Sequence, residues 1–150
     1  MEIITVPNHV LNKKTKDVTS FDQKLAKIVN KMLDIKKQKD AVGLAANQIG
    51  IPYQIAVTGF KDKEDKKISI PEMILINPRI TWKSSNLSVQ RERCLSVNDK
   101  DYDVPRSKKI HIQYQDLDGK KRKFNTRGKL ARIIQHEIDH LNGNKISDYQ

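Results

Sequence analysis

The sequence predicts an α+β fold, with one long helix, then several antiparallel strands, then a second helix. Apolar residues recur at helical spacing near both ends of the chain, and short β-like runs with turn signals fill the middle. No internal repeat, linker or low-complexity segment interrupts the 150 residues. We therefore expect residues 1–150 to form a single domain.

The first predicted helix covers residues 20–37. Ser20 begins a capping box with Gln23, and the apolar positions that follow are three or four residues apart. The next segment, residues 43–50, is rich in small residues and contains two glycines. No Lys-Ser or Lys-Thr pair follows these glycines, so the segment indicates a tight turn and close packing, not a phosphate-binding loop.

Short β-like runs predict strands in the middle of the chain, at residues 54–57, 68–70, 73–76 and 110–114. The last run meets Asp116-Leu117-Asp118-Gly119, which is a turn signal, and the chain returns through residues 121–124. This order predicts a β-hairpin. In the final segment apolar residues recur at helical spacing as far as Leu141, and Gly143 offers a C-terminal cap, so a second helix is expected there.

The composition limits the classes of function. No run of eighteen apolar residues occurs, so no transmembrane helix is expected, and the start lacks the basic and apolar regions of a secretory signal. A single cysteine, Cys94, excludes an intramolecular disulfide and suits a reducing compartment. We therefore expect a cytoplasmic protein, in a bacterial cell or an infected bacterial host.

The chain is strongly basic, with 29 Lys and Arg against 18 Asp and Glu and a formal net charge of +11. Such a surface attracts RNA, the ribosome and other polyanions. However, the few aromatic residues form no run that would serve as a stacking platform for bases. We expect a solvated, lysine-rich surface with weak polyanion affinity, a transient ribosome contact at most, and a monomer.

The last predicted helix carries a metal-binding pattern. His136 and His140 are four residues apart, so both imidazoles project from one face. Glu137 follows the first histidine, as in the His-Glu-x-x-His pattern of metal hydrolases. In the alternative, the match is by chance, His136 is a hydrogen-bonded core residue and His140 lies at the surface. Two of only four histidines fall here around a glutamate, which favours the metal.

A catalytic metal site needs a third protein ligand and an open position for water. Ile146 occupies the position of the third metzincin histidine, and the ten residues after the motif hold no glutamate. The third ligand is therefore expected upstream. The candidates are scattered carboxylates, His9, His111 and Cys94. A thiolate is a strong ligand for a borderline-soft cation, so Cys94 is favoured over its alternative role as a small buried hydrophobe.

With these residues assembled, the chain resembles the peptide deformylase family. Weaker similarity extends from Pro7 to Gly143, and the chain ends seven residues later, without the C-terminal helix of many bacterial members, as in virus-encoded members. Three segments in the family's order and spacing carry the resemblance: Gly43-Leu44-Ala45-Ala46-Asn47-Gln48, Glu92-Arg93-Cys94-Leu95-Ser96 and Gln135-His136-Glu137-Ile138-Asp139-His140.

The resemblance implies removal of the formyl group from N-formylmethionine at the N-terminus of newly synthesised peptides, with release of formate. It also implies antiparallel β-sheets packed around a central C-terminal helix that carries the metal motif. One divalent metal ion would be held by Cys94, His136 and His140. Ligand chemistry alone makes zinc the default, whereas the family points to Fe²⁺, with Zn²⁺, Ni²⁺ or Co²⁺ able to occupy the same site.

The resemblance assigns further roles to individual residues. A metal-bound water attacks the formyl carbon, and Glu137 acts as general acid and base. The Gln48 side-chain amide and the Leu95 backbone N–H stabilise the oxyanion. Glu92 pairs with Arg106 and holds the Cys94 loop, the alternative being a solvated surface pair of little energetic weight. The residues expected to bind substrate are Val42, Gly43, Leu44, Arg93, Arg132 and Ile133.

Three positions depart from the family pattern. Ala41 stands where the first motif usually begins with glycine, and Arg93 replaces the usual glycine beside the metal cysteine. Arg93 would put a bulky cation at the lip of the cleft. Arg132 replaces a usually apolar residue near the methionine pocket. Its stem would lie along the pocket with its head in water, or it would alter the substrate preference.

Two other functions remain open at this point. The same helix would suit a minimal zinc endopeptidase, although Gln48 and Cys94 would then have no role. A basic RNA- or ribosome-binding module with a vestigial site is the alternative from another class, supported by the net charge and by Arg93.

Overall fold

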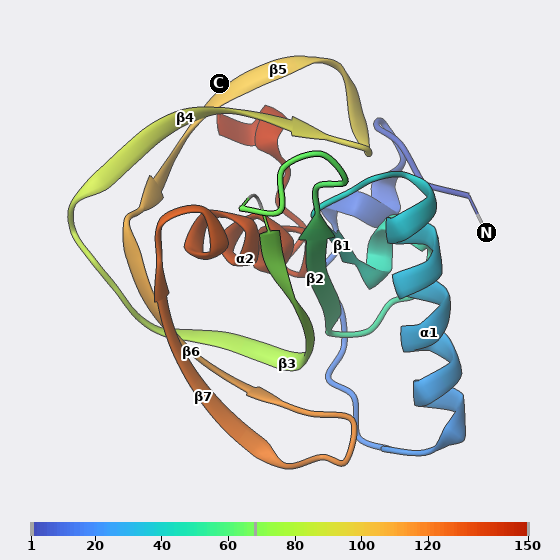
Figure 1. The fold of residues 1–150 in the computed structure, drawn as a ribbon. Coiled ribbons are helices and arrows are strands. Elements are labelled where there is room, and N and C mark those ends of the chain that lie inside the picture. The colour runs from blue at the N-terminus through green and yellow to red at the C-terminus, as the bar shows by residue number, and fades with distance from the viewer. Residues whose placement is uncertain (1, 68, 150) are drawn as a thin grey trace.

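The structure of the protein, a computed structural model, describes residues 2–67 and 69–149 (Figure 1). Its α-helices are α1 (Gln23–Gln38) and α2 (Gly128–Leu141). Three 3-10 helices are η1 (His9–Asn12), η2 (Ala46–Ile49) and η3 (Ile146–Tyr149). The strands are β1 (Gly43–Ala45), β2 (Ile55–Lys61), β3 (Ser69–Lys83), β4 (Leu87–Cys94), β5 (Val97–Ser107), β6 (Lys109–Gln115) and β7 (Lys121–Arg127).

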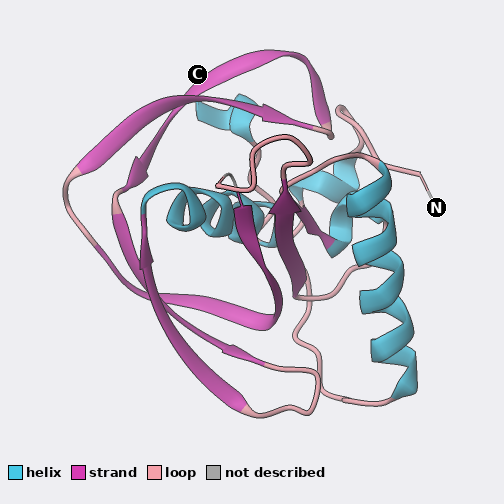
Figure 2. Cartoon of the chain, in the orientation of Figure 1, coloured by secondary structure: helices cyan, strands magenta, loops and turns pink. Residues whose placement is uncertain are grey.

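The strands form two antiparallel sheets. One has five strands in the order β1-β2-β3-β6-β7, and the other is a ribbon of β4 and β5. Figure 2 shows the ribbon curving around one side of α2, while strands of the larger sheet curve around the other. The fold is therefore mixed α and β, and α2 lies at its centre (Figure 1).

The two helices pack on opposite faces of the five-stranded sheet. Successive side chains of a strand point to opposite faces, and β2 shows this clearly. Val57 belongs to the core cluster under α1, whereas its neighbour Ala56 belongs to the cluster under α2. A third cluster beneath the ribbon contains Cys94 and Ile146. The helix that carries His136 and His140 thus packs against the larger sheet and also contacts β5 of the ribbon.

The start of α1 differs from the expected capping box at Ser20. Asp22 is the N-cap, and its Oδ1 accepts a hydrogen bond of 3.1 Å from the Leu25 backbone N–H. Asp is as good an N-cap as Ser, and Asp22 lies two residues nearer to the apolar face. The Ser20 prediction was therefore wrong, and the helix begins at Gln23.

The predicted hairpin is confirmed, because β6 pairs with β7 in antiparallel register. The runs at 68–70 and 73–76 are not separate strands, since one long strand, β3, covers residues 69–83. Ile68 itself lies outside the described residues. The sequence did not predict β4 or β5, which carry many charged residues and form only a two-stranded ribbon.

None of the helices in the described ranges is long and apolar enough to cross a membrane. Ala41 adopts no left-handed backbone conformation, although Asp40 before it does, with φ at 50°. The change from glycine at position 41 therefore introduces no backbone strain.

Candidate active site

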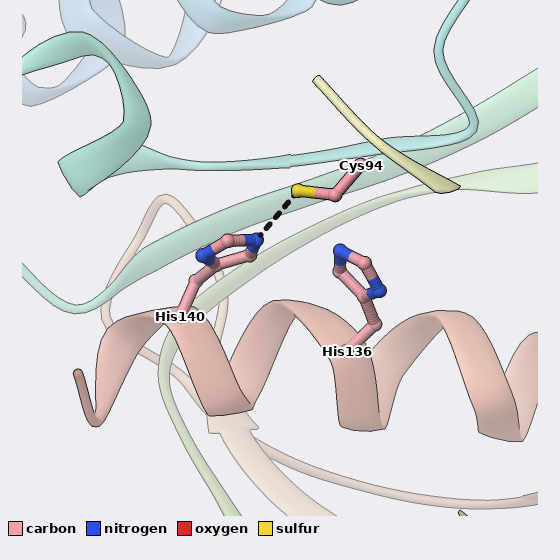
Figure 3. A group of neighbouring side chains, drawn as sticks. All are labelled: Cys94, His136 and His140. Carbon is pink, nitrogen blue, oxygen red and sulfur yellow. Dashed lines mark hydrogen bonds between the residues drawn. The ribbon is translucent and has the colours of Figure 1, made fainter. Parts of the chain in front are cut away.

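Three side chains that bear metal-ligand atoms meet between β4 and α2. Cys94 ends β4, and His136 and His140 lie one turn apart on α2. One ligand atom from each of the three lies within 4.8 Å of the others. Cys94 Sγ is 3.2 Å from His140 Nε2, and Figure 3 shows both imidazoles reaching from the helix toward the sulfur.

The surroundings of this group fit a divalent cation. His136 Nδ1 lies 2.9 Å from Glu92 Oε1, which leaves its Nε2 for a metal. His140 is almost fully buried, and its Nδ1 has no hydrogen-bond partner in the part of the chain that the structure describes. One thiol and two imidazoles are the donors that zinc and similar ions accept in catalytic sites. The donor set and its burial therefore suit a catalytic metal.

Glu137 lies beside the donor group, packed against Gly43 of β1. A Cβ added at Gly43 would lie only 2.6 Å from Glu137 Oε2, so the glycine provides the space for the carboxylate. Glu137 Oε1 is buried and has no partner among the described residues. Burial raises the pKa of Glu137 to about 7, and the charge of His136 opposes this shift. A carboxyl group of this kind can take up and release a proton near neutral pH.

The side-chain amide of Gln48 lies close to Cys94. Its Oε1 accepts a hydrogen bond of 2.9 Å from the Ala45 backbone N–H, which fixes the orientation of the amide. Its Nε2 donates to Ser96 Oγ at 3.0 Å and lies 3.8 Å from Cys94 Sγ. Leu95, half-buried, lines the cleft next to Cys94. The amide donor and the Leu95 segment thus flank the cysteine.

Glu92 is the centre of a buried ionic network. Arg106 donates two hydrogen bonds to its carboxylate, of 2.7 and 2.9 Å, and Arg132 and His136 also contact it. The side chains of Arg106 and Glu92 are only 3% and 7% exposed, so the alternative of a solvated surface pair was wrong. Burial alone would raise the pKa of Glu92, but hydrogen bonds from His136 and Arg106 lower it to about 2. Glu92 is therefore a carboxylate that holds the His136 ring.

Arg132 does not keep its guanidinium in water. The side chain is 11% exposed, and the guanidinium contacts Glu92 and donates to the backbone carbonyls of Ser88 at 2.6 Å and Val104 at 3.0 Å. The prediction of a solvated head was wrong, because a buried carboxylate and two strand carbonyls offer it better partners than solvent. Arg132 thereby ties α2 to both strands of the ribbon.

Arg93, in contrast, is exposed. Its side chain is 83% exposed and pairs with Asp101 of β5 at 2.9 Å. It lines the lip of the cleft, at the position that the sequence predicted.

The site opens into a cleft of about 1120 Å³. Val42 and Gly43 line it, as do Ile133 and Arg132 of α2. The Leu44 side chain does not, because it is fully buried in the core cluster under α1. The expected role of Leu44 in substrate binding stays a prediction, and the burial of its side chain leaves only its backbone for such a contact.

The sequence interpretation gave no role to three residues that extend the site. Asp139 accepts hydrogen bonds from Arg106 at 2.9 Å and from Tyr149 Oη at 2.6 Å. Ser96 Oγ accepts a hydrogen bond from the Gln48 side-chain amide. Asp139 and Ser96 lie within two of the three segments that resemble the deformylase family, so their positions in the sequence could have indicated a role in the site. Nothing in the sequence pattern pointed to Tyr149.

A catalytic-type Cys-His-His donor set, with a buried carboxylate beside it and a substrate-sized cleft above it, defines a metal-dependent hydrolase. The family model described as polypeptide deformylase matches residues 1–150, and the chain belongs to the peptide deformylase family. Members of this family are metal-dependent enzymes that remove the N-formyl group from nascent peptides, and this chain is such an enzyme.

Individual relatives agree with the family assignment. The peptide deformylase of Bartonella tribocorum is 36% identical over 150 residues, covering 98% of this chain and 82% of that protein. That of Buchnera aphidicola is 38% identical over 149 residues, covering 99% and 83%. The crystal structure of a probable peptide deformylase from Synechococcus phage S-SSM7 has a TM-score of 0.89 and 34% identity, covering 99% of both chains.

Proposed function

We propose that this chain removes the formyl group of N-formylmethionyl peptides in the cleft beside Cys94, releasing formate, and that Cys94, His136 and His140 hold the metal. The observation that carries the assignment is that the ligand atoms of these three donors lie within 4.8 Å of one another, while Cys94, His136 and Glu137 line the cleft. The proposed ion is Fe²⁺, as the family resemblance implies, with Zn²⁺, Ni²⁺ or Co²⁺ as alternatives. When bound, the cation supplies Lewis-acid activation of water and of the formyl carbonyl.

Glu137 is proposed to move the protons. Its free Oε1 accepts a proton from the attacking water and passes it to the methionine nitrogen as the formyl C–N bond breaks. Burial, which raises the pKa of this carboxyl, supports the role because the group then exchanges protons near neutral pH. The proton lost by water thus leaves on the peptide amine, and formate carries away the oxygen that water supplied.

Gln48 and Leu95 are proposed to stabilise the developing oxyanion, through the Gln48 Nε2–H and the Leu95 backbone N–H. One such donor contributes about 3–4 kcal/mol in a transition state. The hydrogen bond from the Ala45 N–H supports this role, because it fixes the amide orientation before substrate arrives.

We further propose that residues 1–150 act as one catalytic domain, in which antiparallel sheets packed around α2 carry the site and the amphipathic α1 covers the outer face of the larger sheet. Val42, Gly43, Ile133 and Arg132 are proposed to contact the formylmethionyl residue, and Glu92 with Arg106 to hold His136. A monomeric state, a cytoplasmic location and a transient ribosome contact through the basic surface remain predictions.

The test is a formate-release assay on formyl-Met peptides under anaerobic conditions, with metal analysis on the same sample. We expect one metal ion per chain and formate release that fails in His140→Ala. His9→Ala is the matched control, because His9 is an exposed histidine of η1 and should change neither quantity. Cleavage of internal peptide bonds without formate would replace the proposal with the endopeptidase. RNA binding without metal or turnover would support the vestigial module.

A further inference from the structure

Four basic side chains gather where β6, β7 and α2 meet, and we name them the basic corner: Lys108, Lys109, Arg127 and Lys129. All four are exposed, and they line the cleft that also contains Cys94, His136 and Glu137, which we call the catalytic group. Within residues 2–67 and 69–149, none of the four forms an ion pair. One end of the cleft therefore carries four positive charges without a paired carboxylate.

The register of the hairpin forces two of these charges together. Lys109 and Arg127 are direct cross-strand partners of β6 and β7. Like charges in this arrangement repel and destabilise a sheet. Lys108 adds a third charge beside this pair. Its backbone carbonyl accepts a 3.1 Å hydrogen bond from the N–H of Gly128, which lies between Arg127 and Lys129 in the chain, so the backbones of these residues are adjacent. The corner is thus an electrostatic cost to the fold that an anion would relieve.

The acidic groups of the cleft do not neutralise the corner. Glu92 is buried between Arg106 and Arg132, and Glu137 lies against Gly43. Asp40 also lines the cleft, but it forms no ion pair with the corner within residues 2–67 and 69–149. Two arginines of β4, Arg91 and Arg93, also line the cleft, but their charges are paired. Arg91 pairs with Asp103 at 3.5 Å, and Arg93 pairs with Asp101 at 2.9 Å. Lys39 likewise lines the cleft and forms no ion pair among the described residues, and the corner adds four more unpaired positive charges to the same cleft.

Both walls of the cleft lead from the catalytic group to the corner. Along α2, seven residues separate His136 from Lys129, which is about 10 Å at 1.5 Å per residue. Along the other wall, β4 runs back from Cys94 toward Asn86, whose carbonyl accepts a 3.2 Å hydrogen bond from the Lys108 N–H. An extended peptide covers about 10 Å in roughly three residues.

We propose that the basic corner selects nascent chains that carry an acidic residue about three positions after formylmethionine. The inference rests on the deformylation proposed for the same cleft. A carboxylate at that position would lie between Lys109 and Arg127 and relieve their repulsion. The formyl group of the same peptide would then lie beside Cys94 and Glu137. Peptide is favoured over RNA as the source of the anion, because the corner lines the substrate cleft and offers no aromatic residue for base stacking.

The experiment compares two peptides, formyl-Met-Ala-Ala-Glu-Ser and its Gln analogue, by formate release from the metal-loaded enzyme at 50 and 500 mM KCl. For the wild type we expect kcat/KM to be about three- to tenfold higher for the Glu peptide at low salt, mainly through KM. The ratio should shrink at high salt, because exposed ion pairs are modest and screened. Lys109→Gln combined with Arg127→Gln should bring the low-salt ratio to about one.

The matched control is Lys121→Gln combined with Lys123→Gln, on the same hairpin but outside the cleft, and it should keep the wild-type ratio. Thermal unfolding checks the corner variant, which should be no less stable because a repulsive pair is removed. If that variant does not fold, Lys129→Gln replaces it and should lower the ratio.

Equal kcat/KM for the two peptides in the wild type at low salt would overturn the proposal, as would an unchanged ratio in the corner variant. Loss of affinity for a single-stranded RNA probe in the corner variant, with the peptide ratio intact, would assign the corner to RNA instead. If neither peptide releases formate, the proposed function fails separately. The same pair is then compared by calorimetric binding, where tighter binding of the Glu peptide supports the corner and equal affinity overturns it.

Discussion

Replacing Gly43 with alanine tests the role of Glu137 without substituting any titratable or metal-binding residue. Gly43 lies in β1 with no left-handed backbone, so alanine is conformationally acceptable there. Its new Cβ would lie 2.6 Å from Glu137 Oε2, 3.1 Å from Cδ and 3.2 Å from Cγ. Comfortable contact requires about 3.5 Å, so the carboxylate must move by about 0.9 Å.

A displacement of that size is enough to impair proton transfer. Misplacing a catalytic group by about 1 Å costs on the order of 10²-fold in rate. We therefore expect Gly43→Ala to lower kcat for formate release about 10²-fold. Metal content should stay at the wild-type level, because the three atoms nearest to the new methyl group all belong to Glu137 and none to Cys94, His136 or His140. Overpacking should cost about 1–3 kcal/mol of unfolding free energy in urea.

A double-mutant cycle with Glu137→Gln separates this mechanism from general damage. Once the carboxylate is gone, adding Gly43→Ala should cost little further activity, because both changes act through one group. Wild-type kcat in Gly43→Ala with full metal content would refute the reasoning. Losses that multiply fully in the double variant would also refute it, since they would show that the methyl group acts elsewhere.

Three further changes test the rest of the site. Cys94→Ser should lose most of the bound metal after gel filtration, and unchanged metal analysis would move the third ligand to another residue. Glu137→Gln should keep the metal but lower kcat by about 10²–10⁴-fold in the formate assay, and loss of metal would contradict its role as a proton carrier. Glu92→Gln should lower the unfolding free energy of the metal-free protein in urea by about 3–5 kcal/mol, because Arg132 loses its paired carboxylate and Arg106 keeps only Asp139. The pKa of Glu92 falls from 4.5 to about 2 on folding, so its carboxylate stabilises the fold fully above pH 4.5. That stabilisation is lost as the pH falls toward about 2, and the difference between variant and wild type should narrow over the same range.

Secondary structure was predicted most accurately from the sequence where the residues that contact one another are close together in the chain. The β6–β7 hairpin was predictable because its turn residues and both strands lie within one continuous segment. The same local reasoning misplaced the start of α1, because Ser20 and Asp22 are both good caps and only the packing of the first turn decides between them. It missed β4 and β5, whose charged side chains alternate too weakly to mark a buried face.

The same distinction applies to the site. The spacing of His136, Glu137 and His140 is a property of one helix, so the sequence determined that two imidazoles share a face. That Cys94 supplies the third ligand stays a prediction, and the structure supports it by bringing the Cys94, His136 and His140 ligand atoms within 4.8 Å of one another. The burial of Arg132 against Glu92 was beyond such reasoning, because its partners are on β4 and β5, 28 to 44 residues away in the chain.

The sequence by itself determined which chemical groups this protein has: a helical segment with two histidines and a glutamate, a single cysteine, and three motifs in the order of a deformylase. Only the tertiary structure decided how those groups are held and what surrounds them. It packs Glu137 against Gly43, turns the Arg132 guanidinium inward, and sets Lys109 opposite Arg127 in the same cleft. The physical reason is that donor identity belongs to single residues, whereas burial, charge balance and close contact arise only when distant strands and helices pack together.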